Sequence, residues 1–224
     1  MEKKRERKNE MNLRVIDMGQ DSRRAQYDYF RSLANPYVGV TVNVDVTALL
    51  EWTKAAHGNF FLTFLYAVIR AANRVPELRR RIRGEQVVEY DRCPSSHTVA
   101  LENGAYCYCR LEADKPLEEF LPYAAEAQER ARRNPTLEDG EDGESLFFVS
   151  CVPWISYTSM VQPVPVPADS NPRITWGKYF QQGEQTVMPV TLLAHHALVD
   201  GIHIARFYEA LDREIAAIAA GSTQ

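Results

Sequence analysis

Two adjacent histidines near the C-terminus, His195 and His196, are the residues of this sequence best suited to proton transfer. They follow the apolar run 187–193, which is typical of a strand, and they precede Asp200 and Gly201. Imidazole has the unperturbed pKa closest to neutral of all side chains, so it can accept a proton from a hydroxyl and return one later. The pattern predicts a proton-transfer residue at the end of a rigid strand.

The segment from His195 to Phe207, HHALVDGIHIARF, resembles the catalytic signature of type A chloramphenicol acetyltransferases. Its first part, His-His-x-x-x-Asp-Gly, is also similar to a motif of dihydrolipoamide acyltransferase catalytic domains and of peptide-synthetase condensation domains. These families share a CoA-dependent or carrier-dependent acyltransferase fold. The resemblance covers residues 12–215, and it implies acetyl-CoA as co-substrate and a homotrimer with active sites between subunits.

The resemblance implies that three residues act directly in acetyl transfer. His196, the second histidine, would be the general base that removes the proton of an acceptor hydroxyl and later delivers it to the CoA thiolate. Ser150, in FVSCVPW, falls at the family's oxyanion serine, and Thr175, in RITWGKY, falls at a threonine that assists the oxyanion through a water. The alternatives are a buried, hydrogen-bonded histidine and a strand serine bonded to the backbone.

Asp200 has two possible roles. An aspartate directly before an apolar periodic run is favoured as a helix N-cap. The resemblance implies instead that Asp200 pairs with an arginine near the N-terminus and keeps the catalytic loop in shape, a task that suits the stiff fork of a guanidinium. Arg23 falls at the matching position, and we favour it over the adjacent Arg24. His195 is expected to orient the pair, and His203 to be structural.

The resemblance also assigns residues to the two substrates. These residues are Tyr29, Phe30 and Tyr106 for the acceptor, and Trp154, Lys178 and Tyr179 for CoA. Ordinary surface or core positions are the alternative for each of them. The stretch 35–38 departs from the family's usual sequence, so the identity of the acceptor transfers less well than the chemistry.

Three other groups of residues could suggest a site, but none of them predicts one: the histidines and aspartate of the motif as metal ligands, the cysteines, and a basic run. The histidines and the aspartate of the motif do not predict a metal site, because residues 195–199 resemble strand and turn and no further ligand cluster completes a site. The four cysteines lack a zinc spacing and are expected to be structural thiols. The basic run 79–83 is expected to be a solvated helix end.

Length and charge limit the class of protein. The chain has 224 residues and a formal net charge of −4, which gives no general attraction to nucleic acid or to an anionic membrane. No apolar run approaches the roughly 18–20 residues of a membrane span, and the N-terminus lacks the apolar core of a secretory signal. We expect a disordered basic tail over residues 1–11, a single acyltransferase domain over residues 12–220, and a cytoplasmic location without nucleic-acid or membrane partners.

Hydrophobic periodicity and breaker residues predict the elements that position these groups. Helices are expected over residues 23–33, 47–58, 61–75, 115–134 and 204–218, with Pro122 kinking the fourth helix or delaying its start. Strands are expected over residues 38–46, 86–91, 97–102, 105–111, 146–154, 173–180 and 187–193, and an extended loop over residues 161–172. Strands outnumber a clean strand–helix–strand alternation, which favours an α+β fold, a two-layer sandwich of a mixed β-sheet covered by helices.

The resemblance implies an acetyl-CoA-dependent O-acetyltransferase acting on a hydroxyl of chloramphenicol or a similar small molecule. Transfer would be direct within a ternary complex, because no nucleophile flanks the base. Two alternatives stay open: an acyltransferase for another hydroxylated or thiol acceptor such as dihydrolipoamide, and a non-catalytic binding protein of the same fold. The sequence shows no lipoyl domain or Ala/Pro linker, which disfavours dihydrolipoamide, and condensation domains need two such halves.

Overall fold

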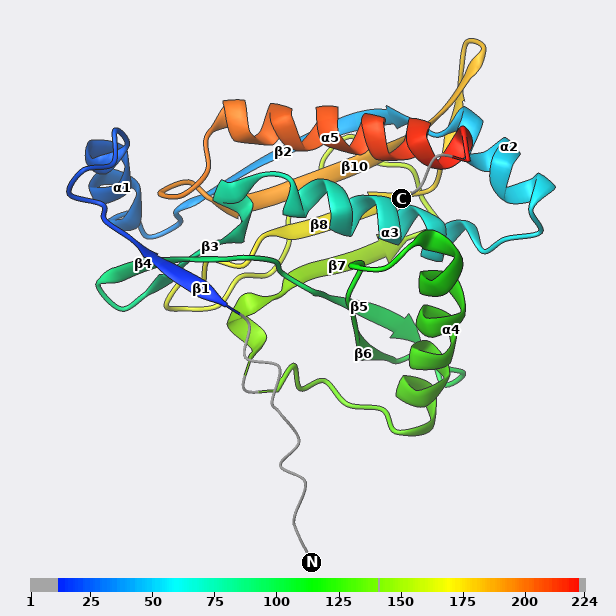
Figure 1. Ribbon diagram of the computed structural model, residues 1–224, viewed down its shortest axis with the longest axis horizontal. Coiled ribbons are helices and arrows are strands. Elements are labelled where there is room, and N and C mark those ends of the chain that lie inside the picture. Colours follow the sequence, from blue (N-terminus) through cyan, green and yellow to red (C-terminus); the bar gives the residue numbers. More distant parts are fainter. Residues whose placement is uncertain (1–11, 141, 222–224) are drawn as a thin grey trace, which may run out of the picture.

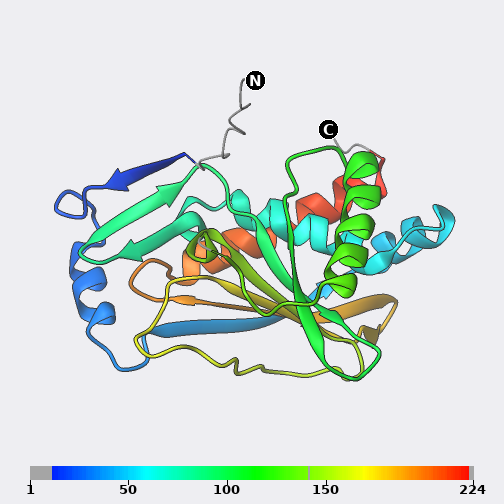
Figure 2. The same ribbon diagram turned by 90° about the horizontal axis from the view of Figure 1, so that it is seen from below.

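A computed structural model describes residues 12–140 and 142–221, so the tail predicted over residues 1–11 lies outside the described residues. The main element is a mixed sheet of seven strands in the order β2-β10-β8-β7-β5-β6, with β9 pairing to β10. β7 runs parallel to both β5 and β8, and the other pairs are antiparallel. Helices cover one face of this sheet (Figures 1 and 2). The predicted α+β architecture is therefore confirmed.

The bounds of the elements agree with most of the predicted ranges. The large sheet comprises β2 (Tyr37–Asp45), β5 (Ser95–Ala100), β6 (Tyr106–Leu111), β7 (Phe147–Val152), β8 (Arg173–Gly177), β9 (Phe180–Gln182) and β10 (Gln185–His195). A smaller sheet, in the order β1-β4-β3, comprises β1 (Leu13–Ile16), β3 (Arg80–Arg83) and β4 (Gln86–Tyr90). The helices are α1 (Arg24–Arg31), α2 (Thr47–Ala55), α3 (Phe60–Asn73), α4 (Leu117–Arg133) and α5 (Gly201–Ala219), with short 3-10 turns at Pro76–Arg79 and Gly143–Ser145.

β10 is the strand that connects the sheet to the histidine pair. Nine of its 11 residues pair with β2, and four pair with β8 on its other side. Successive side chains of a strand point to opposite faces. Val190, Leu192 and Ala194 belong to the buried core on the helix side, and Thr191 and His195 point the other way. Because β10 ends at His195, the sheet places the histidine pair at one of its ends.

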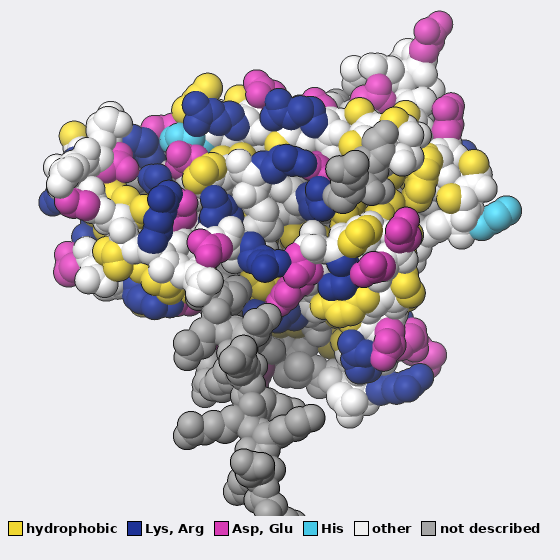
Figure 3. All heavy atoms as spheres, viewed as in Figure 1, with side chains coloured by type: hydrophobic (Ala, Val, Ile, Leu, Met, Phe, Trp, Pro, Cys, Tyr) yellow, Lys and Arg dark blue, Asp and Glu magenta, His cyan; other side chains and the backbone are white. Residues whose placement is uncertain are grey.

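The helix layer contains α3 and α5 at its centre. α3 begins after Asn59, whose side-chain oxygen accepts the N–H of Leu62 at 3.2 Å, and ten of its 14 residues are buried. α5 buries the apolar face that the periodicity predicts. This face comprises Ile204, Phe207, Leu211, Ile215 and Ile218. Basic and acidic side chains are mixed over the outer surface of this layer (Figure 3). Within the described ranges, the helices lack the combined length and apolar character needed to cross a bilayer.

The segment of residues 153–172 runs along the opposite face of the sheet and is yellow in Figure 2. It contains neither helix nor strand, as predicted for its second half. Tyr157 connects it to the sheet: its hydroxyl donates to the backbone oxygen of Thr175 at 2.7 Å and accepts from Thr191 Oγ1 at 3.3 Å. The segment therefore forms part of the folded structure on the side that the helices leave uncovered.

The smaller sheet corrects one prediction. The basic run 79–83, expected to be a solvated helix end, enters strand β3, and Arg81 is only 1% exposed. Alternation within the strand turns Arg81 inward, where its guanidinium donates to backbone oxygens, among them those of Glu144 at 2.6 Å and Leu146 at 3.0 Å. Hydrogen bonds of this kind offset the cost of removing a charge from water. The prediction was wrong because it treated every arginine of the run as solvated.

Strand β1, the start of helix α4 and the four cysteines can also be compared with the predictions. β1 was not predicted, and it forms by antiparallel pairing with β4. α4 begins at Leu117, so Pro122 lies inside the helix and does not delay its start. The thiols of Cys93, Cys107 and Cys109 are buried and that of Cys151 is half-buried, and all four are free.

Replacing Arg81 with methionine is expected to lower the free energy of unfolding by about 3 kcal/mol or more, because several buried carbonyl groups lose their donors. Urea denaturation measures this change. Arg133→Met, at an exposed position of α4, is the control and is expected to change stability by less than about 0.5 kcal/mol. Equal stability of the two variants would contradict the assigned role of Arg81.

Candidate active site

The imidazole of His196 lies in the turn between β10 and α5 and is held on two sides. Its Nδ1 lies 2.9 Å from the backbone oxygen of Val199 and 3.2 Å from Asp200 Oδ1. Its ring stacks on Phe30, with centroids 3.7 Å apart and planes 15° from parallel. Both neighbours of Nδ1 are acceptors, so Nδ1 carries the proton and Nε2 of the neutral ring keeps its lone pair. With the side chain 26% exposed, this nitrogen can accept a proton.

Arg23 fixes the turn that carries His196. Its Nε donates to Asp200 Oδ2 at 2.8 Å, and its two terminal nitrogens donate to the backbone oxygens of His196 at 3.1 Å and Ala197 at 3.3 Å. Arg24 instead pairs with Asp28 at 2.6 Å. Of the two candidate arginines, Arg23 is therefore the partner of Asp200. Its planar fork makes three directed bonds, which a lysine could not reproduce.

The smaller sheet stabilises the position of Arg23 through Asp21. Asp21 Oδ1 accepts the backbone N–H of Arg23 at 2.8 Å, and Asp21 Oδ2 lies 3.4 Å from Arg80 Nη1. Arg80 also pairs with Glu89 at 3.1 Å, and the Glu89 side chain is 5% exposed. A row of alternating charges thus extends from β4 through β3 to the turn beside His196. Ion pairs that are partly buried are screened less by salt than exposed ones.

Asp200 combines the two roles that the sequence left open. It is the residue before α5, in the N-cap position, and it also pairs with Arg23. Its backbone N–H donates to His203 Nδ1 at 2.9 Å. His203 Nε2 lies 3.7 Å from Glu77 Oε1, and burial lowers the pKa of His203. These contacts agree with the expected structural role of His203 at the start of the helix.

His195 is buried beside the turn. Its Nδ1 accepts the backbone N–H of Ala197 at 3.2 Å, and its ring lies edge-on to Tyr37 with centroids 5.8 Å apart. Burial lowers the pKa of His195 to about 4. The ring is therefore neutral at pH 7, and it supports the turn as expected for the first histidine of the pair.

A cavity of about 1080 Å³ contains most of the other predicted site residues. It is lined by residues of the strands β5 to β8 and of the segment 153–163, and also by residues of α3 and α4 such as Phe61 and Gln128. The predicted residues that line it are Ser150, Thr175, Tyr106, Trp154, Lys178 and Tyr179. We call these six residues the cavity group. Tyr106, Trp154 and Tyr179 are exposed by 51%, 76% and 45%, so they lie toward its opening.

A row of hydroxyl groups crosses the sheet beneath this cavity. In the strand register Thr191 pairs with both Thr41 and Thr175, and Thr175 pairs with Ser150. Ser150 Oγ lies 3.5 Å from Thr98 Oγ1. Hydroxyl donors fixed on neighbouring strands can stabilise an oxygen that gains negative charge. Ser150 and Thr175 are the two members of the row that the sequence predicted.

The structure separates the predicted residues into two places. Arg23, Phe30, His196 and Asp200, which we call the histidine group, lie at the end of β10, next to the exposed ring of Tyr29. Two members of the cavity group, Thr175 and Ser150, lie in register with Thr191, four residues before His195, or about 13 Å away along the strand at about 3.3 Å per residue. Ser150 is two strands further across the sheet. A single chain therefore does not bring His196 and Ser150 together.

Three side chains of the cavity wall were missed by sequence reasoning. Gln162 Nε2 donates to Thr175 Oγ1 at 2.6 Å, Thr98 contacts Ser150, and Arg173 forms a buried bidentate pair with Asp169 at 2.7 and 2.8 Å. Only the four-residue spacing of opposite charges at Asp169 and Arg173 was visible as a signal in the sequence. Outside a helix that spacing does not predict a contact.

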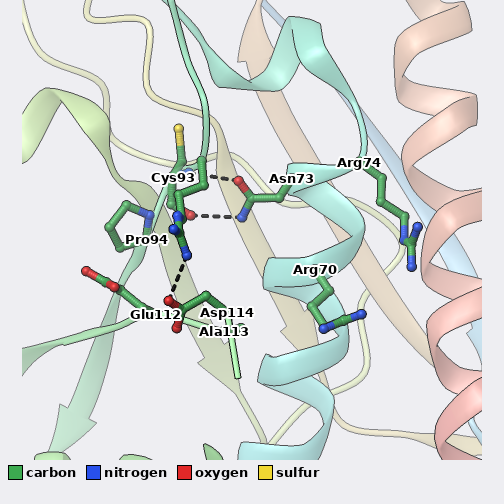
Figure 4. A pocket seen from close by; sticks show the side chains of 9 residues that line it. Arg70, Asn73, Arg74, Cys93, Pro94, Glu112, Ala113 and Asp114 are labelled. Carbon is green, nitrogen blue, oxygen red and sulfur yellow. Dashed lines mark hydrogen bonds and ion pairs between the residues drawn. The ribbon is translucent and has the colours of Figure 1, made fainter. Parts of the chain in front are cut away.

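A second cavity, of about 330 Å³, lies between α3 and the segments 92–94 and 112–114, which precede β5 and follow β6 (Figure 4). Several of its polar groups already have partners: Asn73 bonds the backbone of Cys93 in both directions, and Arg92 pairs with Asp114 at 2.7 Å. None of the predicted site residues lines it. Across the described residues, no group of three or more His, Cys, Asp or Glu side chains has the arrangement of a metal site.

Comparisons with known proteins agree on one family. The model of the chloramphenicol acetyltransferase family matches residues 11–212. A chloramphenicol acetyltransferase of Klebsiella sp. is 30% identical over 205 residues, covering 89% of this chain and 92% of that protein. A solved chloramphenicol acetyltransferase structure has a TM-score of 0.83 at 27% identity, covering 91% of this chain and 100% of that one. The cubic core of a pyruvate dehydrogenase multienzyme complex shares the fold, with a TM-score of 0.63, 21% identity and 88% coverage of both chains.

The buried His195 is expected to make stability fall in acid. Its pKa is about 4 in the folded protein and about 6.5 in an unfolded chain. As the pH falls from about 6.5 toward 4, the unfolded state binds the proton first, so folding loses stability in this window. His195→Gln is expected to reduce the loss between pH 7 and pH 4.5 by about 2 to 3 kcal/mol.

Urea denaturation at a series of pH values measures this difference. The exposed His57 provides the control, and His57→Gln is expected to leave the pH dependence as in the wild type. A His195→Gln variant that loses stability in acid as steeply as the wild type would show that His195 is not buried in its neutral form.

Proposed function

This chain belongs to the chloramphenicol acetyltransferase family and is an acyltransferase, and we propose that it transfers the acetyl group of acetyl-CoA to a hydroxyl of chloramphenicol or of a similar small molecule. The observation that carries the proposal is the bond of His196 Nδ1 to the Val199 carbonyl at 2.9 Å. This bond leaves Nε2 as the nitrogen that accepts a proton.

His196 is the proposed general base. Its Nε2 takes the proton of the acceptor hydroxyl while the hydroxyl oxygen attacks the thioester carbonyl, and it returns the proton to the CoA thiolate as the carbon–sulfur bond breaks. Such general acid–base assistance contributes about 10²–10⁴-fold. The stacked ring of Phe30 and the Arg23–Asp200 pair restrict the direction of Nε2. Because the acceptor oxygen is itself the nucleophile, transfer occurs within a ternary complex and no acyl-enzyme forms.

Ser150 and Thr175 are the proposed stabilisers of the tetrahedral oxyanion. Both lie on neighbouring strands in register, and both line the large cavity. Ser150 donates to the oxyanion directly, and Thr175 acts through a water. Donors that are already in place when the charge develops lower the barrier, and losing one of them costs about 10²–10³ in rate.

The proposed active site lies between two subunits of a homotrimer. Proton transfer requires heavy atoms about 3 Å apart, whereas the register of the sheet separates the histidine group from the cavity group within one chain. A second copy that places its histidine group over the cavity group completes the site. A closed cyclic trimer contains three such interfaces. This separation of the two groups supports a site between subunits independently of the family, while the number of subunits is inferred from the family.

The cavity offers different surfaces to the two substrates. Its volume of about 1080 Å³ reaches the upper end of the usual range for ligand sites, about 300–1,000 Å³. For CoA we propose the ammonium of Lys178, which suits phosphate, and the exposed rings of Trp154 and Tyr179. For the acceptor we propose Tyr29 and Phe30 from the subunit that supplies His196, and Tyr106 from the cavity. The list of acceptor residues is thus divided between two copies of the chain.

The proposal includes one acyltransferase domain over residues 12–220 and a cytoplasmic location. The helices and both sheets contribute side chains to one hydrophobic core, which supports the single domain. The four free thiols support a reducing compartment. The net charge of −4 supports a small-molecule acceptor rather than a nucleic acid or an anionic membrane.

His196→Ala is expected to lower the release of CoA thiol from acetyl-CoA by at least about 10²-fold, because the base is lost. The assay measures the CoA released from acetyl-CoA by chromatography, with chloramphenicol as acceptor and, in parallel, with dihydrolipoamide, whose own thiols would mask a thiol-release signal. His57→Ala, at an exposed position, is the matched control and is expected to keep wild-type activity. Wild-type protein that acetylates neither acceptor would reject the proposed function, and a fully active His196→Ala variant would reject the assigned base.

Coexpression of His196→Ala with Ser150→Ala tests the site between subunits. In mixed cyclic trimers some interfaces combine an intact His196 with an intact Ser150 from the next subunit. Random assortment is expected to restore up to about a quarter of the wild-type activity. Mixing the two purified trimers without subunit exchange is the control. Coexpressed activity no greater than that of the separate variants would show that each site uses one chain only.

A further inference from the structure

The amide of Gln162 lies in the wall of the large cavity against the hydroxyl of Thr175. Its Nε2 donates to Thr175 Oγ1 at 2.6 Å, and both residues line the cavity together with Ser150. We propose that Gln162 is a positioning residue for acetyl transfer, which fixes the direction of the Thr175 hydroxyl proton. The inference rests on the proposed function, since it takes this cavity as the place where the thioester reacts.

The hydroxyl of Thr175 can make only a limited set of hydrogen bonds. A threonine hydroxyl has one proton to donate and two lone pairs, whereas an amide N–H can only donate. The bond from Gln162 therefore occupies a lone pair of Thr175 Oγ1 and leaves its proton for another acceptor. The backbone oxygen of Thr175 already accepts from Tyr157 OH at 2.7 Å. The hydroxyl proton is thus available to the cavity, where a water or an oxyanion can accept it.

The backbone around Gln162 directs its side chain inward. Val161 is 91% exposed and Pro163 is exposed, whereas Gln162 between them is half-buried. This alternation is that of an extended segment. The ring of Pro163 fixes its own φ and restricts the conformation of the residue before it. A side chain that starts from a restrained backbone keeps its donor in one place, which a positioning role requires.

Ser150 has a comparable neighbour, although a more distant one. Thr98 Oγ1 lies 3.5 Å from Ser150 Oγ, and Ser150 pairs with Thr175 across β7 and β8. Each of the two hydroxyls in the cavity thus has a second polar side chain beside it. The contact at Thr175 is shorter by almost an ångström, and in it the Nε2 amide of Gln162 is the donor and the Thr175 hydroxyl oxygen is the acceptor. Gln162 is therefore the neighbour with the stronger influence on the reaction.

Two substitutions separate positioning from the filling of space. Gln162→Leu keeps the volume and removes the donor, and it is expected to lower kcat about two- to tenfold, because one neutral hydrogen bond is lost. Gln162→Glu introduces a carboxylate that only accepts, so the Thr175 proton turns away from the cavity. A larger loss of kcat, about ten- to a hundredfold, is expected for it. The KM for acetyl-CoA is expected to stay unchanged in both variants.

The experiment measures kcat and KM by thiol release from acetyl-CoA with chloramphenicol, using the full-length protein. Each substitution at residue 162 is made in the wild type, in Thr175→Val and in Thr175→Ser, and melting temperatures verify that the variants are folded. The effects are expected to disappear in Thr175→Val, which lacks the hydroxyl, and to persist in Thr175→Ser, which keeps it. Gln86→Leu, at an exposed position of β4, is the control and is expected to behave as the wild type.

The outcomes distinguish this inference from the function on which it rests. Wild-type protein that releases no thiol would overturn both. An active wild type with full activity in Gln162→Leu and Gln162→Glu would overturn the inference alone. So would losses of kcat at residue 162 that are equally large with and without the Thr175 hydroxyl, since these would show that Gln162 acts on the structure and not through Thr175.

Discussion

The guanidinium of Arg23 is the group on which the geometry of the histidine turn depends. It bonds the carboxylate of Asp200 and the backbone oxygens of His196 and Ala197, and so joins the end of β10 to the start of α5. With the turn in this shape, His196 Nδ1 lies 2.9 Å from the Val199 carbonyl oxygen, so the edge of the ring that carries Nε2 points away from this carbonyl. The turn also buries Ala197, Leu198 and Val199, and these contacts together offset the cost of ordering it, about 1–2 kcal/mol for each residue. Asp21 accepts a hydrogen bond from the backbone of Arg23 and also pairs with Arg80 of β3, so the turn depends on the smaller sheet as well.

The large sheet sets the distances between the groups that would react. β10 contributes Thr191 to the row of hydroxyls and His195 to the turn, so the spacing between row and turn is that of an extended strand and cannot adjust. Helices bury one face of the sheet, and the large cavity is lined by strand residues, by the segment 153–163 and by residues of α3 and α4. A fold of this kind gives a stiff surface with two incomplete halves of a site. In the proposed trimer the two halves lie on opposite sides of an interface, which would couple catalysis to assembly.

The sequence predicted most helices and strands because their apolar periodicity reflects burial against one sheet. The face of α5 from Ile204 to Ile218 is an example. The motif residues at 195–200 were predicted through resemblance, and Arg23 was preferred to Arg24 on the same ground. Arg81, by contrast, was expected to be solvated, because composition cannot reveal that carbonyl groups 63 and 65 residues later in the chain accept its hydrogen bonds. Gln162 carried no signal either, since a glutamine in a proline-rich stretch is typical of an exposed loop.

By itself the sequence determined the family, the mixed sheet with its helix layer, and the residue types available for acyl transfer, because all of these follow from local pattern and from the spacing of a motif. Tertiary structure alone decided which arginine pairs with Asp200, which nitrogen of His196 is free, and that the histidine group and the cavity group lie apart in one chain. These facts depend on contacts between segments distant in sequence, such as the 177 residues that separate Arg23 from Asp200. The type of a residue determines which hydrogen bonds its side chain can donate or accept, whereas only the packing of the chain determines which partner it meets.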